Sequence, residues 1–269
     1  MTRPSPLIIG HRGASAHAPE NTLAAFELAL AAKADGVEFD IRLARDGVPV
    51  VVHDATLKRT ALRDGSIAAL SSTELGRIGV GAWFNRRFPA RAKIGYASET
   101  IPTLQQVMEQ IAPRCRALYV ELKCARGEGQ ELAAAVVQVV HAGGAIRQVI
   151  VESFTLEAIA EVKRLAPELR TAALFERRLS RPLPGREQIV KRAQAVNANE
   201  LALQRTLVSR RMLDAANAAG LPVVAWTVDH PSWIDQAHAL GLHALITNHP
   251  ARMCSARDAL FDKKIDVRS

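Results

Sequence analysis

Residues 148–176 read QVIVESFTLEAIAEVKRLAPELRTAALFE, and this stretch contains the pattern that decides the fold. A short apolar run (148–154) is followed by a stretch whose apolar residues recur every three or four positions (155–167), and then by a second apolar run (169–176). The two runs are typical of buried strands, and the middle stretch is typical of an amphipathic helix. Two strands joined by a helix are expected to lie parallel in one sheet.

The same order of elements repeats along the whole chain. Eight strand-then-helix units in 269 residues predict a (β/α)₈ TIM barrel, for which about 250 residues is typical. An open doubly wound sheet is the alternative, but it would more often have a Gly-rich phosphate loop after its first strand, and none is present. The expected strands are 6–13, 36–54, 117–123, 148–154, 169–176, 198–204, 222–229 and 243–250, and the expected helices are 21–34, 103–112, 130–144, 155–167, 186–196, 207–220, 232–241 and 251–260.

The composition is that of a folded α/β protein with excess positive charge. Apolar residues make up 48% of the chain, and the net charge of +8 favours anionic partners such as phosphate esters, acidic membrane surfaces or nucleic acid. No signal peptide or membrane span is recognisable, and Cys115, Cys124 and Cys254 form no CxxC pair. We therefore expect one domain over residues 1–269, a cytoplasmic location and three buried thiols.

Residues 55–98 interrupt the regular spacing and are too long for an ordinary connection. They predict an insertion after the second strand, with a short helix near SSTELGRI (71–78) and loops elsewhere. Eight basic residues against two acidic ones give this segment a net charge of +6. It is either an ordinary solvated surface or a cap over the barrel mouth that attracts an anionic substrate or makes transient contact with a membrane.

Charged side chains occur where the predicted strands end, which is where barrel enzymes place their active sites. Glu38 and Asp40 are two positions apart, so a strand points both to the same face, and Glu121 lies on the next strand. Three carboxylates without a nearby Cys favour a hard divalent cation, Mg²⁺ or Ca²⁺. The alternative is a set of salt bridges to Arg12, Arg42 or Lys123.

His11 and His53 each end a strand-like run beside a charged residue, which makes them the candidate acid/base pair. Arg12 and Lys123 supply fixed positive charge for a phosphodiester. We expect Trp226 to line the substrate site, and Glu20, Asn21 and Ser153 to support the site from behind, although helix capping alone explains Asn21 or Thr22. The other six histidines are expected at surface, cap or turn positions, namely His17, His141, His230, His238, His243 and His249.

These residues together resemble the glycerophosphodiester phosphodiesterase family. The matching motifs occur in the family's order: GHRG (10–13), PENT (19–22), GVEFDI (36–41), PVVVHD (49–54) with TLKRT, WF (83–84), IPTL (101–104), VELK (120–123), SF (153–154), AWTV (225–228) and TNHP (247–250). The resemblance implies a (β/α)₈ barrel that splits a glycerophosphodiester into glycerol 3-phosphate and an alcohol. It also implies that Glu38, Asp40 and Glu121 hold the metal, that His11 and His53 act as base and acid, and that Arg12 and Lys123 hold the phosphate.

Two positions depart from the family pattern. Asn248 stands where the family usually has Asp, and Asp229 stands where it often has Asn. We expect both to affect the surroundings of the site and alcohol selectivity rather than the reaction.

Two other functions stay open at this stage. A related lysophospholipase D or sphingomyelinase D-like enzyme would use GAWFNRRF (81–88) as a membrane-facing patch. A non-enzymatic anion or nucleic-acid binder would fit the positive charge, but aromatic residues for base stacking are few, so no nucleic-acid partner is expected.

Overall fold

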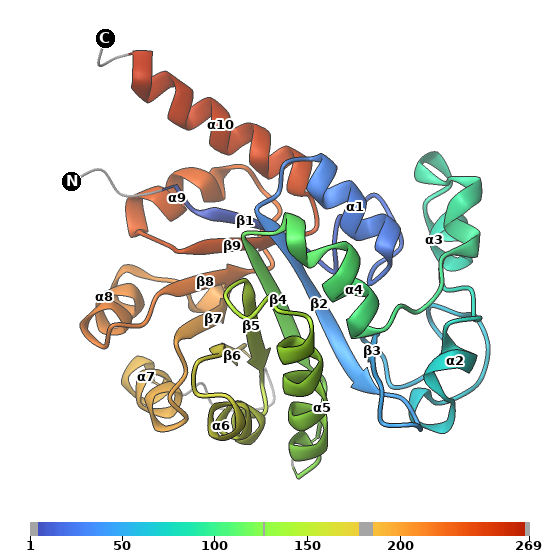
Figure 1. The fold of residues 1–269 in the computed structure, drawn as a ribbon. Coiled ribbons are helices and arrows are strands. Elements are labelled where there is room, and N and C mark those ends of the chain that lie inside the picture. The colour runs from blue at the N-terminus through green and yellow to red at the C-terminus, as the bar shows by residue number, and fades with distance from the viewer. Residues whose placement is uncertain (1–4, 126, 178–184, 267–269) are drawn as a thin grey trace.

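The computed structural model, which describes residues 5–125, 127–177 and 185–266, confirms the predicted (β/α)₈ barrel. Eight parallel strands form a continuous sheet, and the last of them pairs with the first, so that the sheet closes on itself (Figure 1). In the order of their hydrogen bonding, the barrel strands are β1 (Leu7–His11), β2 (Gly36–Leu43), β4 (Ala117–Leu122), β5 (Val149–Ser153), β6 (Arg170–Phe175), β7 (Glu200–Gln204), β8 (Val223–Trp226) and β9 (Ala244–Thr247).

Helices surround the barrel, and α10 extends beyond it toward the C-terminus (Figure 1). Thr22 caps the first helix by accepting a hydrogen bond from the Ala25 backbone N–H, as predicted for Asn21 or Thr22. The surrounding helices are α1 (Leu23–Ala31), α4 (Leu104–Gln110), α5 (Gly129–Ala142), α6 (Leu156–Leu165), α7 (Arg186–Ala195), α8 (Arg210–Ala218), α9 (Ser232–Leu240) and α10 (Pro250–Asp266), and single 3₁₀ turns lie at Ala112–Arg114 and Arg205–Leu207.

Alternation along the strands separates an outer core from the barrel interior. On β2, Val37, Phe39 and Ile41 belong to the apolar layer between the barrel and the helices, where the Phe39 ring lies 5.5 Å from that of Phe26. The intervening Glu38 and Asp40 therefore point into the barrel. On β4 the same alternation places Glu121 inside. The interior also contains buried Glu152 and Glu200, the latter accepting from the Tyr119 hydroxyl at 2.9 Å. The remaining described interior side chains form a cluster of apolar residues and one tyrosine, namely Ile9, Ala117, Tyr119, Ile150, Ala172, Leu174, Ala202, Val224, Ala244 and Ile246.

The segment 36–54, expected as one strand and its extension, is a hairpin. The chain turns at Gly47, whose φ of 74° favours glycine, and β3 (Pro49–Val51) runs back antiparallel to β2. This reversal brings His53 back toward the carboxyl-end side of the barrel. The side chain of Arg42 supports it by donating from Nε to the His53 carbonyl oxygen at 2.8 Å.

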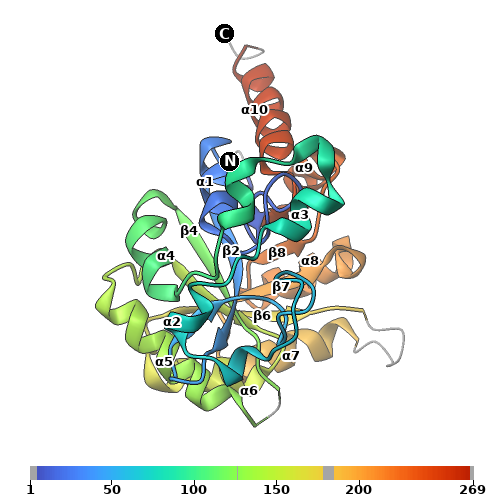
Figure 2. The same cartoon turned by 90° about the vertical axis from the view of Figure 1, so that its right-hand side faces the viewer.

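The predicted insertion is present after this hairpin, and it lies in front of the strands when the molecule is turned as in Figure 2. It contains the expected short helix, α2 (Ser72–Leu75), which begins with a capping box at Ser71. The expectation of loops elsewhere was wrong, because α3 (Ala82–Arg87) and 3₁₀ turns at Ile67–Ala69, Pro89–Arg91 and Ile94–Ser98 are also present. Helix α3 has no side-chain cap, and burial of Phe84 against the barrel-side residues Ala18 and Ala25 stabilises it.

Within the described ranges, no helix is long and apolar enough to cross a membrane. The cytoplasmic location stays a prediction. The thiols of Cys115 and Cys254 are buried and that of Cys124 is half-buried, and all three are free cysteines.

Candidate active site

Three buried carboxylates meet at the carboxyl ends of two neighbouring strands. Glu38 and Asp40 come from β2 and Glu121 from β4, and the strand register places Asp40 directly beside Glu121. One carboxylate oxygen from each residue lies within 4.8 Å of the other two. Their exposed fractions are 1%, 0% and 7%, so water screens their mutual repulsion poorly.

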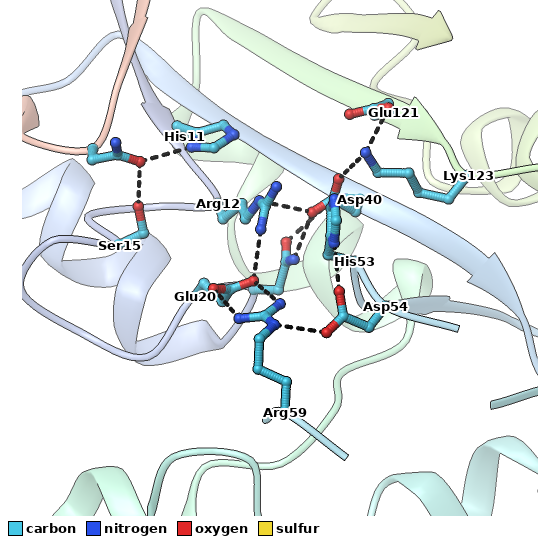
Figure 3. A network of polar contacts seen from close by, with 12 residues as sticks. His11, Arg12, Ser15, Glu20, Asp40, His53, Asp54, Arg59, Glu121 and Lys123 are labelled. Atoms are coloured by element: carbon cyan, nitrogen blue, oxygen red, sulfur yellow. Dashed lines mark hydrogen bonds and ion pairs between the residues drawn. The ribbon is translucent and has the colours of Figure 1, made fainter. Parts of the chain in front are cut away.

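Arg12 and Lys123 approach these carboxylates from opposite sides (Figure 3). The Arg12 backbone N–H donates to Glu38 Oε2 at 2.9 Å, and its Nε lies 3.1 Å from Asp40 Oδ2. Lys123 Nζ lies 3.0 Å from Asp40 Oδ1 and 2.7 Å from Glu121 Oε1. The structure therefore contains the salt bridges that were predicted as the alternative to a metal site, from Asp40 to Arg12 and from Asp40 and Glu121 to Lys123. Arg42, the third alternative partner, instead donates to the backbone carbonyls of His53 and Lys123.

These two cations do not balance the three acids. Burial alone would raise the pKa of Asp40, but the charges of Arg12 and Lys123 hold it well below its usual range. Burial, together with the charge of Asp40, raises the pKa of Glu121 to about 7 and that of Glu38 well above its usual range. Glu38 Oε1 is also buried without a hydrogen-bond partner among the described residues. A hard divalent cation fits this oxygen-rich, under-neutralised site.

His11 ends β1, and its ring is held from one side. Its Nδ1 lies 2.7 Å from Asn248 Oδ1, and its Nε2 faces Glu38 Oε2 at 3.9 Å. Burial and the neighbouring Arg12 charge lower the pKa of His11 to about 4. His11 is therefore a neutral imidazole near pH 7, with its Nε2 turned toward the carboxylates.

His53 has a different partner, because its Nδ1 lies 2.6 Å from Asp54 Oδ1. Burial lowers the pKa of His53, while the carboxylates of Asp40 and Asp54 oppose that shift. Arg59 donates to Asp54 and, through both terminal nitrogens, to Glu20, which in turn accepts from Arg12 (Figure 3). A continuous polar chain therefore connects His53 with Arg12.

The remaining predicted residues differ in how closely they approach this centre. Glu20 accepts from Arg12 at 2.8 Å, and Asn21 Nδ2 donates to Asp40 Oδ2 at 2.8 Å, so both support the charged groups. Ser153 holds the backbone instead, donating to the Leu122 carbonyl oxygen at 3.0 Å. Trp226 and Phe154 pack edge to face and help line a cavity of about 240 Å³ that also contacts both histidines.

Two residues at the site were not singled out from the sequence. Glu152 lies beside Glu121 in the strand register, is 1% exposed, and its pKa is raised well above the usual range by burial and by the charges of Glu38 and Glu121. Its position two residues inside the end of a strand-like run was the available signal. Arg59 lies in the insertion, where no strand periodicity marks its direction.

The two departures from the family pattern lie next to His11. Asn248 contacts the His11 ring itself, rather than only the surroundings of the site, and Asp229 lies behind it, accepting from Asn248 Nδ2 at 2.8 Å. His17 and His249, expected at peripheral positions, lie near this edge with ring nitrogens 3.2 Å apart.

A closed parallel barrel with acidic, basic and imidazole groups at the carboxyl ends of its strands has the arrangement of a TIM-barrel enzyme, and comparisons with known proteins identify the family. Residues 11–252 match the family described as "Glycerophosphoryl diester phosphodiesterase family". The chain belongs to this family and is a phosphodiester-hydrolysing enzyme.

Three relatives of known name or structure match over nearly their whole length. The glycerophosphodiester phosphodiesterase of Caldanaerobacter subterraneus is 28% identical, over 91% of this chain and 94% of the relative. A phosphodiesterase of Oleispira antarctica, whose structure was solved in complex with the product sn-glycerol-3-phosphate, is 30% identical with a TM-score of 0.78, over 94% of this chain and 97% of that one. A glycerophosphodiester phosphodiesterase of Agrobacterium tumefaciens has a TM-score of 0.75 and 25% identity, over 93% of this chain and 99% of that one.

Proposed function

We propose that this enzyme hydrolyses glycerophosphodiesters to glycerol 3-phosphate and an alcohol such as choline, ethanolamine or glycerol. Family membership supports the reaction class, and the relative solved with sn-glycerol-3-phosphate supports the product. The observation that carries the proposal is the pair of histidines beside the acidic cluster, one with an amide partner and one with a carboxylate partner.

In this proposal, Glu38, Asp40 and Glu121 hold Mg²⁺ or Ca²⁺, and Arg12 and Lys123 bind the phosphate. The bound cation would supply positive charge that stabilises the additional negative charge of the five-coordinate transition state. Arg12 and Lys123 both contact Asp40 at present. When substrate binds, each would divide its contacts between Asp40 and the anionic oxygens of the phosphate. The guanidinium presents two donors to phosphate, whereas the lysine ammonium acts as a point charge.

The two histidines have opposite tasks. Neutral His11 accepts a proton at Nε2 from the attacking oxygen, which is either water or a substrate glycerol hydroxyl that first forms a cyclic phosphate. His53 gives its Nε2 proton to the departing alkoxide, and Asp54 stabilises its protonated form. The carboxylate partner suits a group that must be cationic before it acts, and the amide partner suits one that must be neutral.

The test is turnover of glycerophosphocholine with Mg²⁺ or Ca²⁺ by the variants His11→Ala and His53→Ala. General acid–base groups contribute about 10²–10⁴-fold, so each variant should lose at least about a hundredfold in kcat. His141→Ala is the matched control, because His141 pairs with Glu168 on the surface. Near-normal turnover of either site variant would contradict its role, and full activity in EDTA would contradict the cation.

A lysophospholipid substrate is the second candidate, and one feature favours it. A cavity of about 690 Å³ opens on the His11 side and is walled by Leu62, Trp83 and Phe88 of the insertion together with Arg87 and Arg91. Such a wall suits an acyl chain beside an anionic headgroup. Faster turnover of lysophosphatidylcholine than of glycerophosphocholine would establish this alternative, and the reverse would support the first proposal.

A further inference from the structure

We propose that Asp229 is a positioning residue that sets the tautomer of His11 through the side chain of Asn248. The inference rests on the proposed role of His11 as the base. Asp229 itself is too far along the chain of hydrogen bonds to touch the reacting atoms. It acts by deciding which end of the Asn248 amide faces the imidazole.

The three side chains form a linear set of contacts across the junction of three strand ends. His11 ends β1, Asn248 follows β9, and Asp229 follows β8. His11 Nδ1 lies 2.7 Å from Asn248 Oδ1, and Asn248 Nδ2 donates to Asp229 Oδ2 at 2.8 Å. Because β1, β9 and β8 are hydrogen-bonded neighbours, the barrel itself holds these residues in place.

Asp229 is anchored so that it acts only as an acceptor toward Asn248. Its Oδ1 accepts from the Thr247 hydroxyl at 3.0 Å and from the Asn248 backbone N–H at 2.8 Å. Its Oδ2 accepts from the Asn248 side chain. Turning the Asn248 amide over would place its carbonyl oxygen against Asp229 Oδ2, so that two acceptors faced each other.

The carbonyl oxygen of Asn248 is consequently fixed toward His11, where it also accepts from the Ser15 hydroxyl at 2.8 Å. An amide oxygen is only an acceptor, so His11 Nδ1 must carry the hydrogen. The unprotonated nitrogen of neutral His11 is then Nε2, which faces the acidic cluster. This is the tautomer that accepts a proton from an attacking oxygen at the cluster.

The contacts predict what each substitution does. In Asp229→Asn, the new carbonyl oxygen keeps the bonds from Thr247 and from the backbone of Asn248, so the new NH₂ faces the Asn248 side chain. Asn248 then turns its oxygen toward position 229 and its NH₂ toward His11, which selects the opposite tautomer. In Asn248→Asp, two carboxyl groups face each other at a distance of about one hydrogen bond, which requires a shared proton.

The double variant Asp229→Asn/Asn248→Asp restores the order of donors and acceptors. The NH₂ group at position 229 donates to the carboxylate at position 248, and that carboxylate accepts from His11 Nδ1–H. A role in packing alone predicts that the two losses add, whereas the tautomer argument predicts mutual rescue.

The experiment measures kcat and KM for glycerophosphocholine in the four proteins of this cycle. We expect kcat of Asp229→Asn to fall between about tenfold and a hundredfold, which is less than the roughly 10²–10⁴-fold that the general base itself contributes, with KM changed less than about twofold. The double variant should return to within about fivefold of the parent. Asp46→Asn is the matched control, because Asp46 lies exposed in the turn between β2 and β3 and accepts from Ser72, away from His11.

A second readout needs no turnover. Proteins labelled with ¹⁵N-histidine report whether Nδ1 or Nε2 of His11 carries the hydrogen, with His11→Ala assigning the signal. The parent and the double variant should show Nδ1–H, and Asp229→Asn should show Nε2–H. Unchanged kcat in Asp229→Asn, a double variant no better than the worse single variant, or an unchanged tautomer would each overturn the inference. Failure of the proposed function would appear separately, as a fully active His11→Ala.

Discussion

Replacement of Glu121 by Gln should stabilise the protein when divalent cations are absent. The side chain is 7% exposed, and its pKa is raised from 4.5 to about 7 by burial and by the charge of Asp40, against the attraction of Lys123. One pKa unit corresponds to about 1.4 kcal/mol, so ionising Glu121 in the folded protein costs about 3 kcal/mol. The contact with Lys123 is already included in this pKa, so its loss is not a separate cost.

The sign follows from proton binding. Between pH 4.5 and about 7 the folded state binds the Glu121 proton and the unfolded state does not, so this group makes stability fall as pH rises through that interval. Below it, the neutral carboxyl resembles the glutamine amide. In EDTA, Glu121→Gln should therefore match the parent near pH 4.5 and exceed it by up to about 3 kcal/mol at pH 8.

Urea unfolding in EDTA at several pH values measures this difference. Adding Mg²⁺ at pH 8 should reverse the order, because a cation at a thousand times its Kd stabilises the parent by about 4.1 kcal/mol, whereas the variant has lost a ligand. Glu168→Gln is the control, since Glu168 pairs with His141 at the surface. A variant that is no more stable than the parent at pH 8 in EDTA, or a difference independent of pH, would refute the reasoning.

Three further outcomes are expected. Binding of Mg²⁺ near pH 7 should release protons and tighten as pH rises from 6 to 8, because Glu38 and Glu121 have raised pKa values; calorimetry in buffers of different ionisation enthalpy measures this, and no release would contradict it. Asp54→Asn should lower kcat and move the basic limb of the pH–kcat/KM profile to lower pH, because His53 loses the carboxylate that raises its pKa; an unshifted profile would exclude that role. Ile94 is 98% exposed beside Lys93 and should contact anionic membranes. The variant Ile94→Ser should therefore co-sediment less with phosphatidylglycerol vesicles than the parent, and equal sedimentation would rule this contact out.

The sequence was most informative where the direction of a functional side chain follows from the alternation of residues along a strand. Alternation on β2 placed Glu38 and Asp40 on the inner face, and the repeated strand–helix units predicted the barrel that brings Glu121 beside them. Periodicity failed in the insertion, because α3 is short, uncapped and stabilised by Phe84 packing against Ala25 and Ala18, which lie 59 and 66 positions earlier in the chain. Such long-range packing leaves no local signal.

The partners of the two histidines show the same contrast between features that the local sequence predicts and features that only long-range packing creates. His53 contacts Asp54, its neighbour in the chain, so the carboxylate that distinguishes it was visible in the motif PVVVHD. His11 contacts Asn248, 237 positions away, and only closure of β1 against β9 brings them together. Because that closure also holds β1 between two strands, His11 is fixed although it lies near the N-terminus. The sequence thus identifies His11 as a candidate base, but the protonation state of its ring depends on Asn248, a partner that only the fold brings into contact.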